Sequence, residues 1–177
     1  TEWQTMPFTE EVKDRDPRLA QSIRTPGYKR IGAKRVQGPD LGVTITGYQP
    51  IKFVQDTTAS GGQIDRNDRS TCDMPVFRYA EVLLNYAEAK AELGSLSDDD
   101  LNITINEIRS RVGMPALTMK YLHDKQPDWY LSSEEYGYPN VTGSNEIVNA
   151  ILEIRRERTV ELIQEGFRLQ DLYRWKA

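Results

Sequence analysis

The stretch from Glu157 to Trp175, ERTVELIQEGFRLQDLYRW, constrains the fold more than any other part of the sequence. Its charged residues recur at three- and four-residue spacings, so partners lie on neighbouring turns of one helical face. Apolar residues lie between the charges on several sides. A helix with this pattern is expected to be buried, with its ions paired inside the protein. Gly166 predicts a kink or a break between two helices.

An alanine-rich helix is predicted over residues 77–93, because apolar residues recur there at helical spacing. Asp73 suits its N-cap and Gly94 its C-terminal cap. Charged residues interrupt one face of this helix, and we expect them to dock against the stretch from Glu157 to Trp175. The predicted structural ion network comprises Arg78, Glu81, Glu88, Glu157, Arg158, Glu161, Glu165, Arg168, Asp171 and Arg174.

Two helix hairpins are predicted in the second half of the chain. Ser97 and Asp100 have the spacing of a capping box and open a helix that follows the one over 77–93 after only a few residues. These two helices are expected to form an antiparallel hairpin, close in length to the roughly 34 residues of a tetratricopeptide repeat. A third helix from Ser144 and a fourth over 167–175 form the second hairpin.

The first part of the chain has a different character. Residues 1–72 hold most of the glycines, and alternating residues over 43–46 and 51–53 predict one or two short strands. Residues 73–177 form the helical part, with a long aromatic loop at 118–143. The expected fold class is mainly α, with tetratricopeptide-like helix hairpins and an irregular, loop-rich N-terminal part carrying short strands. We expect one structural unit, truncated at both ends.

The composition argues against several classes of function. The chain has 23 Lys and Arg against 27 Asp and Glu, spread along its length, which gives no basic surface for nucleic acid. No apolar run approaches the roughly 20 residues of a transmembrane helix. A single cysteine and a single histidine cannot form a Cys/His zinc cluster. No metal and no cofactor are therefore expected.

The carboxylates of Glu157, Glu161 and Glu165 have two interpretations. They could supply the acid and the base of a glycosidase, which needs two carboxyls opposed across a cleft and about 5–9.5 Å apart. Carboxylates on one helix with arginines between them are more typical of a structural ion network. The structural interpretation is favoured, and it expects that loss of a buried partner such as Arg168 costs about 3–5 kcal/mol.

Aromatic residues are the one lead to a binding function. Sugar rings stack their C–H faces on Trp and Tyr, while sugar hydroxyls need polar neighbours, and the loop at 118–143 offers both. The alternative is that these rings pin a long loop to the body of the protein through their large apolar area. The candidate ligand-binding residues are Trp129, Tyr130, Tyr136, Tyr138 and Trp3.

Three ordered motifs resemble the SusD/RagB family of cell-surface nutrient-binding lipoproteins from Bacteroidetes. The first is RYAEVLLNYAEA at 78–89, and the second is the pattern of Asn, Ile, Arg, Arg and Gly-Met-Pro within 106–115. The third is the gapless match over 157–175. The Asp-Pro-Arg-Leu segment at 16–19 also looks like part of the family pattern. The resemblance covers the C-terminal half of the sequence that is typical of family members.

The resemblance implies a fragment of a SusD-like α–α superhelix without catalytic activity. It implies a protein held by a lipid anchor on the outer face of the outer membrane, with the anchor segment outside this sequence. Such a protein binds a glycan or another nutrient and delivers it to a TonB-dependent, SusC-like transporter. Two other hypotheses stay open: a helical-repeat scaffold that contacts only the transporter, and a carbohydrate-active enzyme.

Overall fold

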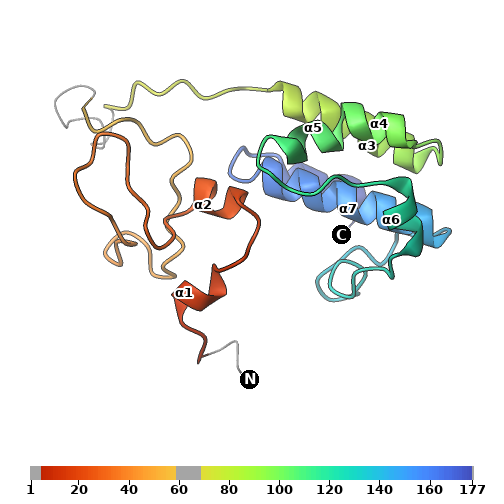
Figure 1. Cartoon of the computed structure of the whole chain (residues 1–177), viewed down its shortest axis with the longest axis horizontal. Coiled ribbons are helices and arrows are strands. Elements are labelled where there is room, and N and C mark those ends of the chain that lie inside the picture. Colours follow the sequence, from red (N-terminus) through yellow and green to blue (C-terminus); the bar gives the residue numbers. More distant parts are fainter. Residues whose placement is uncertain (1–4, 59–68, 177) are drawn as a thin grey trace. The chain divides into compact units, whose positions relative to one another are not determined.

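The computed structural model describes residues 5–58 and 69–176, which belong to two compact units. One unit is Thr1–Val76 and the other is Phe77–Ala177. Helices are the regular structure of both units, and the described residues contain no strand (Figure 1). The prediction of a mainly helical fold is therefore confirmed.

The first unit is mostly loop and has two short helices, α1 (Phe8–Glu11) and α2 (Arg18–Ser22). Asp16 starts α2, because one of its carboxylate oxygens accepts the backbone N–H of Arg18 at 2.9 Å. The same carboxylate holds the buried guanidinium of Arg18 in a two-pronged ion pair, with N–O distances of 2.9 and 2.6 Å. The Asp-Pro-Arg-Leu segment is thus a helix start with its own ion pair.

Short strands were expected over 43–46 and 51–53, and this prediction is wrong. Asp40 directs the backbone into turns, because its carboxylate accepts a backbone N–H two residues later and its carbonyl oxygen accepts two further N–H groups. Without a paired neighbour, Ile45 is 98% exposed. The strand-like pairing found in the described part of this unit is an isolated antiparallel bridge that involves Pro50.

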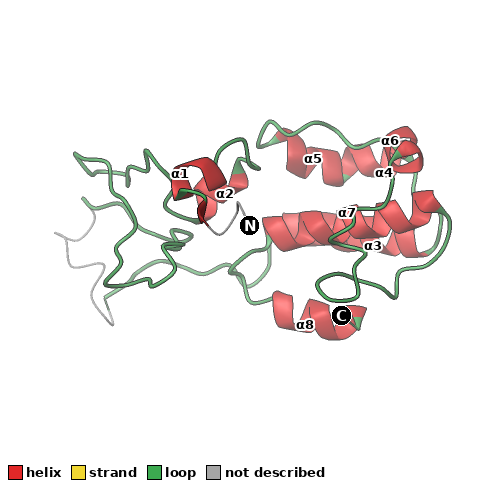
Figure 2. Ribbon diagram, turned by 90° about the horizontal axis from the view of Figure 1, so that it is seen from below, coloured by secondary structure: helices red, strands yellow, loops and turns green. Residues whose placement is uncertain are grey.

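The second unit is built around α3 (Tyr79–Glu92) and α7 (Asn145–Glu161), which pack side by side (Figure 2). The helix α3 begins after Arg78, whose backbone is extended, and not at the predicted cap Asp73. Pro75 argues against a start at Asp73, because a proline disfavours helical backbone in the residue before it, here Met74.

The predicted glycine cap at the end of α3 is confirmed. Gly94 has a φ of +65°, and its N–H donates to the carbonyl oxygen of Ala91 at 3.0 Å. The N–H of Ser95 donates to the carbonyl oxygen of Lys90 at 2.9 Å. These paired bonds are those of a Schellman motif, in which the left-handed position favours glycine. The chain therefore turns sharply toward α4 (Asp98–Ile103).

The capping box predicted at Ser97 and Asp100 is confirmed, because each side chain binds the backbone N–H of the other residue. The expected single helix is nevertheless two helices, α4 and α5 (Ile105–Ser110). They meet at Thr104, which has φ −129° and ψ −91° and whose hydroxyl donates to the carbonyl oxygen of Asp100 at 2.5 Å. A threonine hydroxyl bonded to the preceding turn competes with the helical backbone.

The region 118–143 was expected to be a loop throughout, but it begins with a helix, α6 (Met119–Asp124). The hydroxyl of Thr118 caps α6 by accepting a backbone N–H of the first turn at 3.1 Å. Asn149 attaches α6 to α7, because its buried amide donates to two backbone carbonyl oxygens at the end of α6, at 2.8 and 2.7 Å. A helix of 6 residues is too short for its periodicity to be seen in a sequence.

The break predicted at Gly166 is confirmed. The helix α7 ends at Glu161, and α8 (Arg168–Trp175) begins after a turn. Gly166 has a φ of +87° within that turn, a conformation that L-residues with side chains rarely adopt. The predicted third and fourth helices are therefore α7 and α8, with starts and ends close to those expected.

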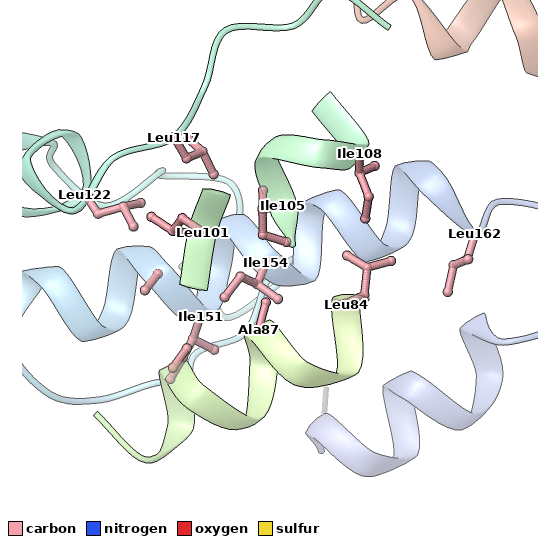
Figure 3. Packing of buried hydrophobic residues seen from close by; sticks show 12 residues of the cluster. Leu84, Ala87, Leu101, Ile105, Ile108, Leu117, Leu122, Ile151, Ile154 and Leu162 are labelled. Carbon is pink, nitrogen blue, oxygen red and sulfur yellow. The ribbon is translucent and has the colours of Figure 1, made fainter. Parts of the chain in front are cut away.

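The core of the second unit lies between α3, α7 and the pair α4–α5 (Figure 3). Leu84 of α3 and Ile105 of α5 are fully buried, and Ile154 of α7 is only 1% exposed. The buried core residues are Leu84, Ala87, Ala91, Leu101, Ile105, Ile108, Leu117, Leu122, Ala150, Ile151, Ile154 and Leu162.

Truncation of Ile154 to alanine is expected to lower the free energy of unfolding by about 2–5 kcal/mol, because it leaves a cavity among close-packed side chains. The matched control is Ile103→Ala in α4, where the side chain is 60% exposed. This control is expected to change stability by no more than about 0.5 kcal/mol. Urea unfolding followed by circular dichroism measures both, and equal losses would contradict the described core.

Candidate functional site

Ion pairs join the start of α3 to the end of α7. The guanidinium of Arg78 lies 2.7 Å from the carboxylate of Glu161 and 2.8 Å from that of Glu165. Arg111, just after α5, binds the same Glu161 carboxylate at 2.8 Å. Burial disfavours the charged form of Arg78, but hydrogen bonds from the two carboxylates outweigh it and raise the pKa of Arg78 above its usual value. The four side chains form one charged cluster.

Two further ion pairs lie along α7. Glu157 pairs with Arg109 of α5, and these side chains are 2% and 10% exposed. Arg109 also donates from Nε to the backbone carbonyl oxygen of Pro115 at 2.6 Å. Arg158 binds the carboxylate of Asp171 in α8 at 2.7 Å, and both side chains are buried. These pairs connect α7 to α5 and to α8.

Glu88 connects α3 to α8. Its carboxylate accepts a hydrogen bond from Arg174 at 2.9 Å and one from the indole N–H of Trp175 at 2.5 Å. Arg174 also pairs with Asp171 at 3.0 Å. The hydrogen bond to Glu88 is the main cause that raises the pKa of Arg174. Charges on α3 thus meet charges of the stretch from 157 to 175.

Two members of the predicted network lie outside these clusters. Glu81 makes no ion pair within the described part of the chain. Arg168 is exposed, and its guanidinium donates to the hydroxyls of Tyr138 and Thr159, both at 2.9 Å, and to no carboxylate of the described residues. The expectation that Arg168 is a buried ion partner is therefore wrong, because the first residue of α8 lies at the surface.

Arg109 and Arg111 are ion-pair partners that the sequence did not reveal. Both lie in the segment 106–115, whose motif resembles the family pattern. Their partners Glu157 and Glu161 are 48 and 50 positions away in the chain. Spacing within one helix identifies partners only on the same helix, so it could not detect these pairs.

The three carboxylates that were considered as a possible catalytic acid and base are all bound to arginine. Glu157, Glu161 and Glu165 have side chains that are 2%, 3% and 4% exposed. A glycosidase needs two carboxyls that face the substrate across a cleft. Within the described ranges, no group of three or more His, Cys, Asp or Glu side chains could hold a metal ion. The geometry thus favours the structural interpretation of this network.

Three aromatic side chains of the loop after α6 are exposed together. Trp129 is 78% exposed, Tyr130 47% and Tyr136 58%. The rings of Tyr130 and Tyr136 are stacked at 7° with their centroids 5.7 Å apart, and Trp129 meets Tyr130 edge-on at 5.8 Å. Such geometries are favourable for aromatic pairs. We call these three side chains the aromatic platform.

Asp128 anchors the start of this loop to α7. One carboxylate oxygen accepts the N–H groups of Tyr130 and Leu131, both at 3.0 Å, and the other binds Arg156 of α7 at 2.5 Å. Burial tends to raise the pKa of Asp128, but the hydrogen bonds from Leu131 and Arg156 outweigh this effect and lower the pKa below its usual value. The charged form of Asp128 therefore favours the folded loop.

Backbone hydrogen bonds close the other end of the loop. The N–H of Tyr138 donates to the carbonyl oxygen of Leu131 at 2.7 Å, and that of Gly137 donates to Ser133 at 3.0 Å. The backbone approaches itself so closely that a Cβ at Gly137 would lie 2.3 Å from the carbonyl oxygen of Leu131. Glycine is therefore required here, and the backbone fixes the shape of the loop.

Tyr138 differs from the other loop aromatics because it is buried. Only 5% of it is exposed, and its ring meets Trp175 edge-on at 5.3 Å. The guanidinium of Arg155 lies 5.0 Å from the Tyr138 ring centroid and 4.9 Å from that of Trp175. Tyr138 thus pins the loop to the body, as the alternative interpretation proposed, and is not accessible for stacking. Trp3 lies outside the described residues.

Arg155 is a third residue whose role could not be predicted. It is buried, its Nε and Nη1 atoms have no hydrogen-bond partner among the residues that the structure describes, and burial lowers its pKa. Two aromatic faces compensate in part, because ring quadrupoles attract a cation. The sequence signal is weak, since Arg155 is one of several arginines in α7 and its ring partners lie elsewhere in the chain.

Substitution of Arg158 by alanine is expected to lower the free energy of unfolding by up to about 3–5 kcal/mol, because it removes the buried partner of the Asp171 carboxylate and leaves only the pair with the partly exposed Arg174. The matched control Arg168→Ala removes an exposed arginine and is expected to cost about 1 kcal/mol or less. Chemical unfolding curves compare the two variants. Equal losses of unfolding free energy in the two variants would contradict the expectation that the buried Arg158–Asp171 pair stabilises the fold more than the exposed Arg168 does.

Acidification is expected to release the start of the aromatic loop before the core. Because the folded-state pKa of Asp128 is lowered, its contribution is complete at neutral pH and declines as pH falls below the unfolded value of about 3.9 toward the folded pKa. Hydrogen-exchange protection of the Tyr130 and Leu131 amides measures this change. The variant Asp128→Asn should lack the pH-dependent step, and constant protection of the parent down to about pH 2 would contradict this account.

The sequence profile of the SusD family matches residues 2–177. Comparisons with curated proteins and with solved structures give no significant match. Proteins of this family are generally non-catalytic, nutrient- or glycan-binding proteins of the outer membrane that work with TonB-dependent transporters. No helix in the described part of this chain is long and apolar enough to cross a membrane. With nearly its whole length matched, the chain belongs to the SusD family.

Proposed function

We propose that this chain forms part of a non-catalytic binding protein and that the aromatic platform contacts a glycan. The observation that supports this proposal is the joint exposure of Trp129, Tyr130 and Tyr136 on a loop that is fixed at both ends. Large rings usually bury their apolar area. A ligand that covers these rings would remove that area from water.

Stacking and hydrogen bonding would share the recognition of a sugar. The platform offers ring faces for the C–H faces of pyranoses, and loop side chains such as Ser132 and Glu134 are exposed nearby in the sequence. The loop is already ordered by Asp128, Gly137 and Tyr138. A preformed surface loses less conformational freedom on binding, so more of the contact energy appears as affinity.

The cellular setting that we propose follows from family membership. The whole protein would be lipid-anchored, facing outward from the outer membrane, and would pass its ligand to a SusC-like, TonB-dependent transporter. The paired state of Glu157, Glu161 and Glu165 supports a binding role without hydrolysis. The nutrient would leave the platform chemically unchanged.

A protein-contact scaffold is the second candidate function. The observation that favours it is an exposed stripe on α3 formed by Tyr79, Val82 and Tyr86, which are 73%, 53% and 44% exposed. Their spacing of three and four places them on one helical face. A helix of a partner protein could pack on this stripe. In this case the chain would bind its transporter and no sugar.

The platform is tested with the full chain on a glycan array, followed by calorimetry with the glycans that bind. Trp129→Ala and Tyr136→Ala are each expected to weaken binding about tenfold, which corresponds to about 1.4 kcal/mol. The control Tyr121→Ala removes a tyrosine of α6 that is 48% exposed and outside the platform, and it should bind like the parent.

The same measurements separate the two functions. Unchanged affinity in both platform variants would exclude the platform as the contact surface. The scaffold function would be supported instead if no glycan bound and the transporter co-purified with the parent chain but not with Val82→Glu. Glycan binding that is lost only in the platform variants would support the proposal.

A further inference from the structure

We propose that Glu135 makes the aromatic platform selective for neutral and amine-bearing sugars and against acidic sugars. This inference rests on the proposed function, because it concerns the ligand class of the same surface. The hydroxyl of Tyr136 donates a hydrogen bond to the Glu135 carboxylate. That contact places a negative charge at the edge of one ring of the platform.

The carboxylate of Glu135 changes the acidity of the Tyr136 phenol. The hydrogen bond to Glu135 raises the pKa of the Tyr136 phenol above its usual value, as expected for a phenol beside an anion. Tyr136 is 58% exposed, so a ligand stacked on its ring would lie close to the same carboxylate. Glu135 is therefore positioned to contact substituents of a bound sugar.

No cation of the loop balances this carboxylate. The segment from 128 to 138 contains Asp128, Glu134 and Glu135 and no lysine or arginine. Arg156 pairs with Asp128 and leaves the other two carboxylates without an ion pair in the described structure. The cation that precedes the segment, Lys125, pairs with Glu153 of α7. The loop segment that carries the platform is therefore acidic.

The chemistry of a carboxylate determines which sugars it favours. An ionised carboxylate only accepts hydrogen bonds, so sugar hydroxyls and ammonium groups can bind it as donors. The charged group of a uronate or of a sulfated sugar has no proton to donate, and it repels the carboxylate. Two unit charges 4 Å apart in water interact by about 1 kcal/mol, which is about a fivefold change in affinity. At high salt this effect declines, because exposed charges are screened.

The experiment measures the affinity of the full chain for three classes of glycan of equal length. They are neutral N-acetylglucosamine oligomers, amine-bearing glucosamine oligomers and acidic galacturonate oligomers. An array of further neutral and acidic glycans extends the comparison. Affinity is expected to be lowest for acidic glycans. In Glu135→Gln, binding of acidic glycans should rise about fivefold and that of amine-bearing glycans should fall by a similar factor. Binding of neutral glycans should stay within about twofold, and the differences should vanish in 1 M salt.

Glu134→Gln is the matched control, because it removes the same charge from the same loop and leaves the hydrogen bond between Glu135 and the Tyr136 hydroxyl in place. Glu134→Gln should change the ratio of affinities for acidic and amine-bearing glycans less than Glu135→Gln does. Neutral binding that depends on Trp129, with equal affinity for acidic glycans and no effect of Glu135→Gln, would overturn this inference and leave the proposed function intact. Absence of binding to every glycan would overturn both.

Discussion

Paired burial of charge along α7 is the constraint on which the rest of the second unit depends. A buried ion is tolerated only when a partner and hydrogen bonds compensate for its lost hydration. Glu157, Arg158 and Glu161 are such ions, and their partners come from the start of α3, from α5 and its end, and from α8. Displacement of any of these elements would remove an ion-pair partner from a buried charge. Apolar burial drives the packing, while the ion pairs determine which helix ends meet.

The same helix also positions the surface that we propose to bind a ligand. Arg155 and Arg156 precede the buried charges of α7 and hold the loop after α6, one through the ring of Tyr138 and the other through Asp128. One helix thus carries residues for the core and residues for the loop. Because the loop is held by backbone bonds and by these two arginines, exposure of Trp129 is a property of an ordered structure.

Features that depend on neighbouring residues were predicted correctly from the sequence. The Ser97 capping box, the cap at Gly94 and the break at Gly166 each involve residues only a few positions apart. The strands expected over 43–46 and the single helix expected across Thr104 were wrong. A strand also needs a partner, and a helix can be interrupted by one side-chain hydrogen bond, so periodicity alone could not decide either case.

By itself, the sequence determined the helical class, the family and the presence of charges too densely placed to be solvated. Only the tertiary structure decided which arginine meets which glutamate, since Arg111 and Glu161 are 50 positions apart. It also decided that Tyr138 is buried and Trp129 exposed, although both are aromatic residues of one loop. Burial depends on what the rest of the chain places beside a side chain, here Arg155 of α7, and no local pattern contains that information.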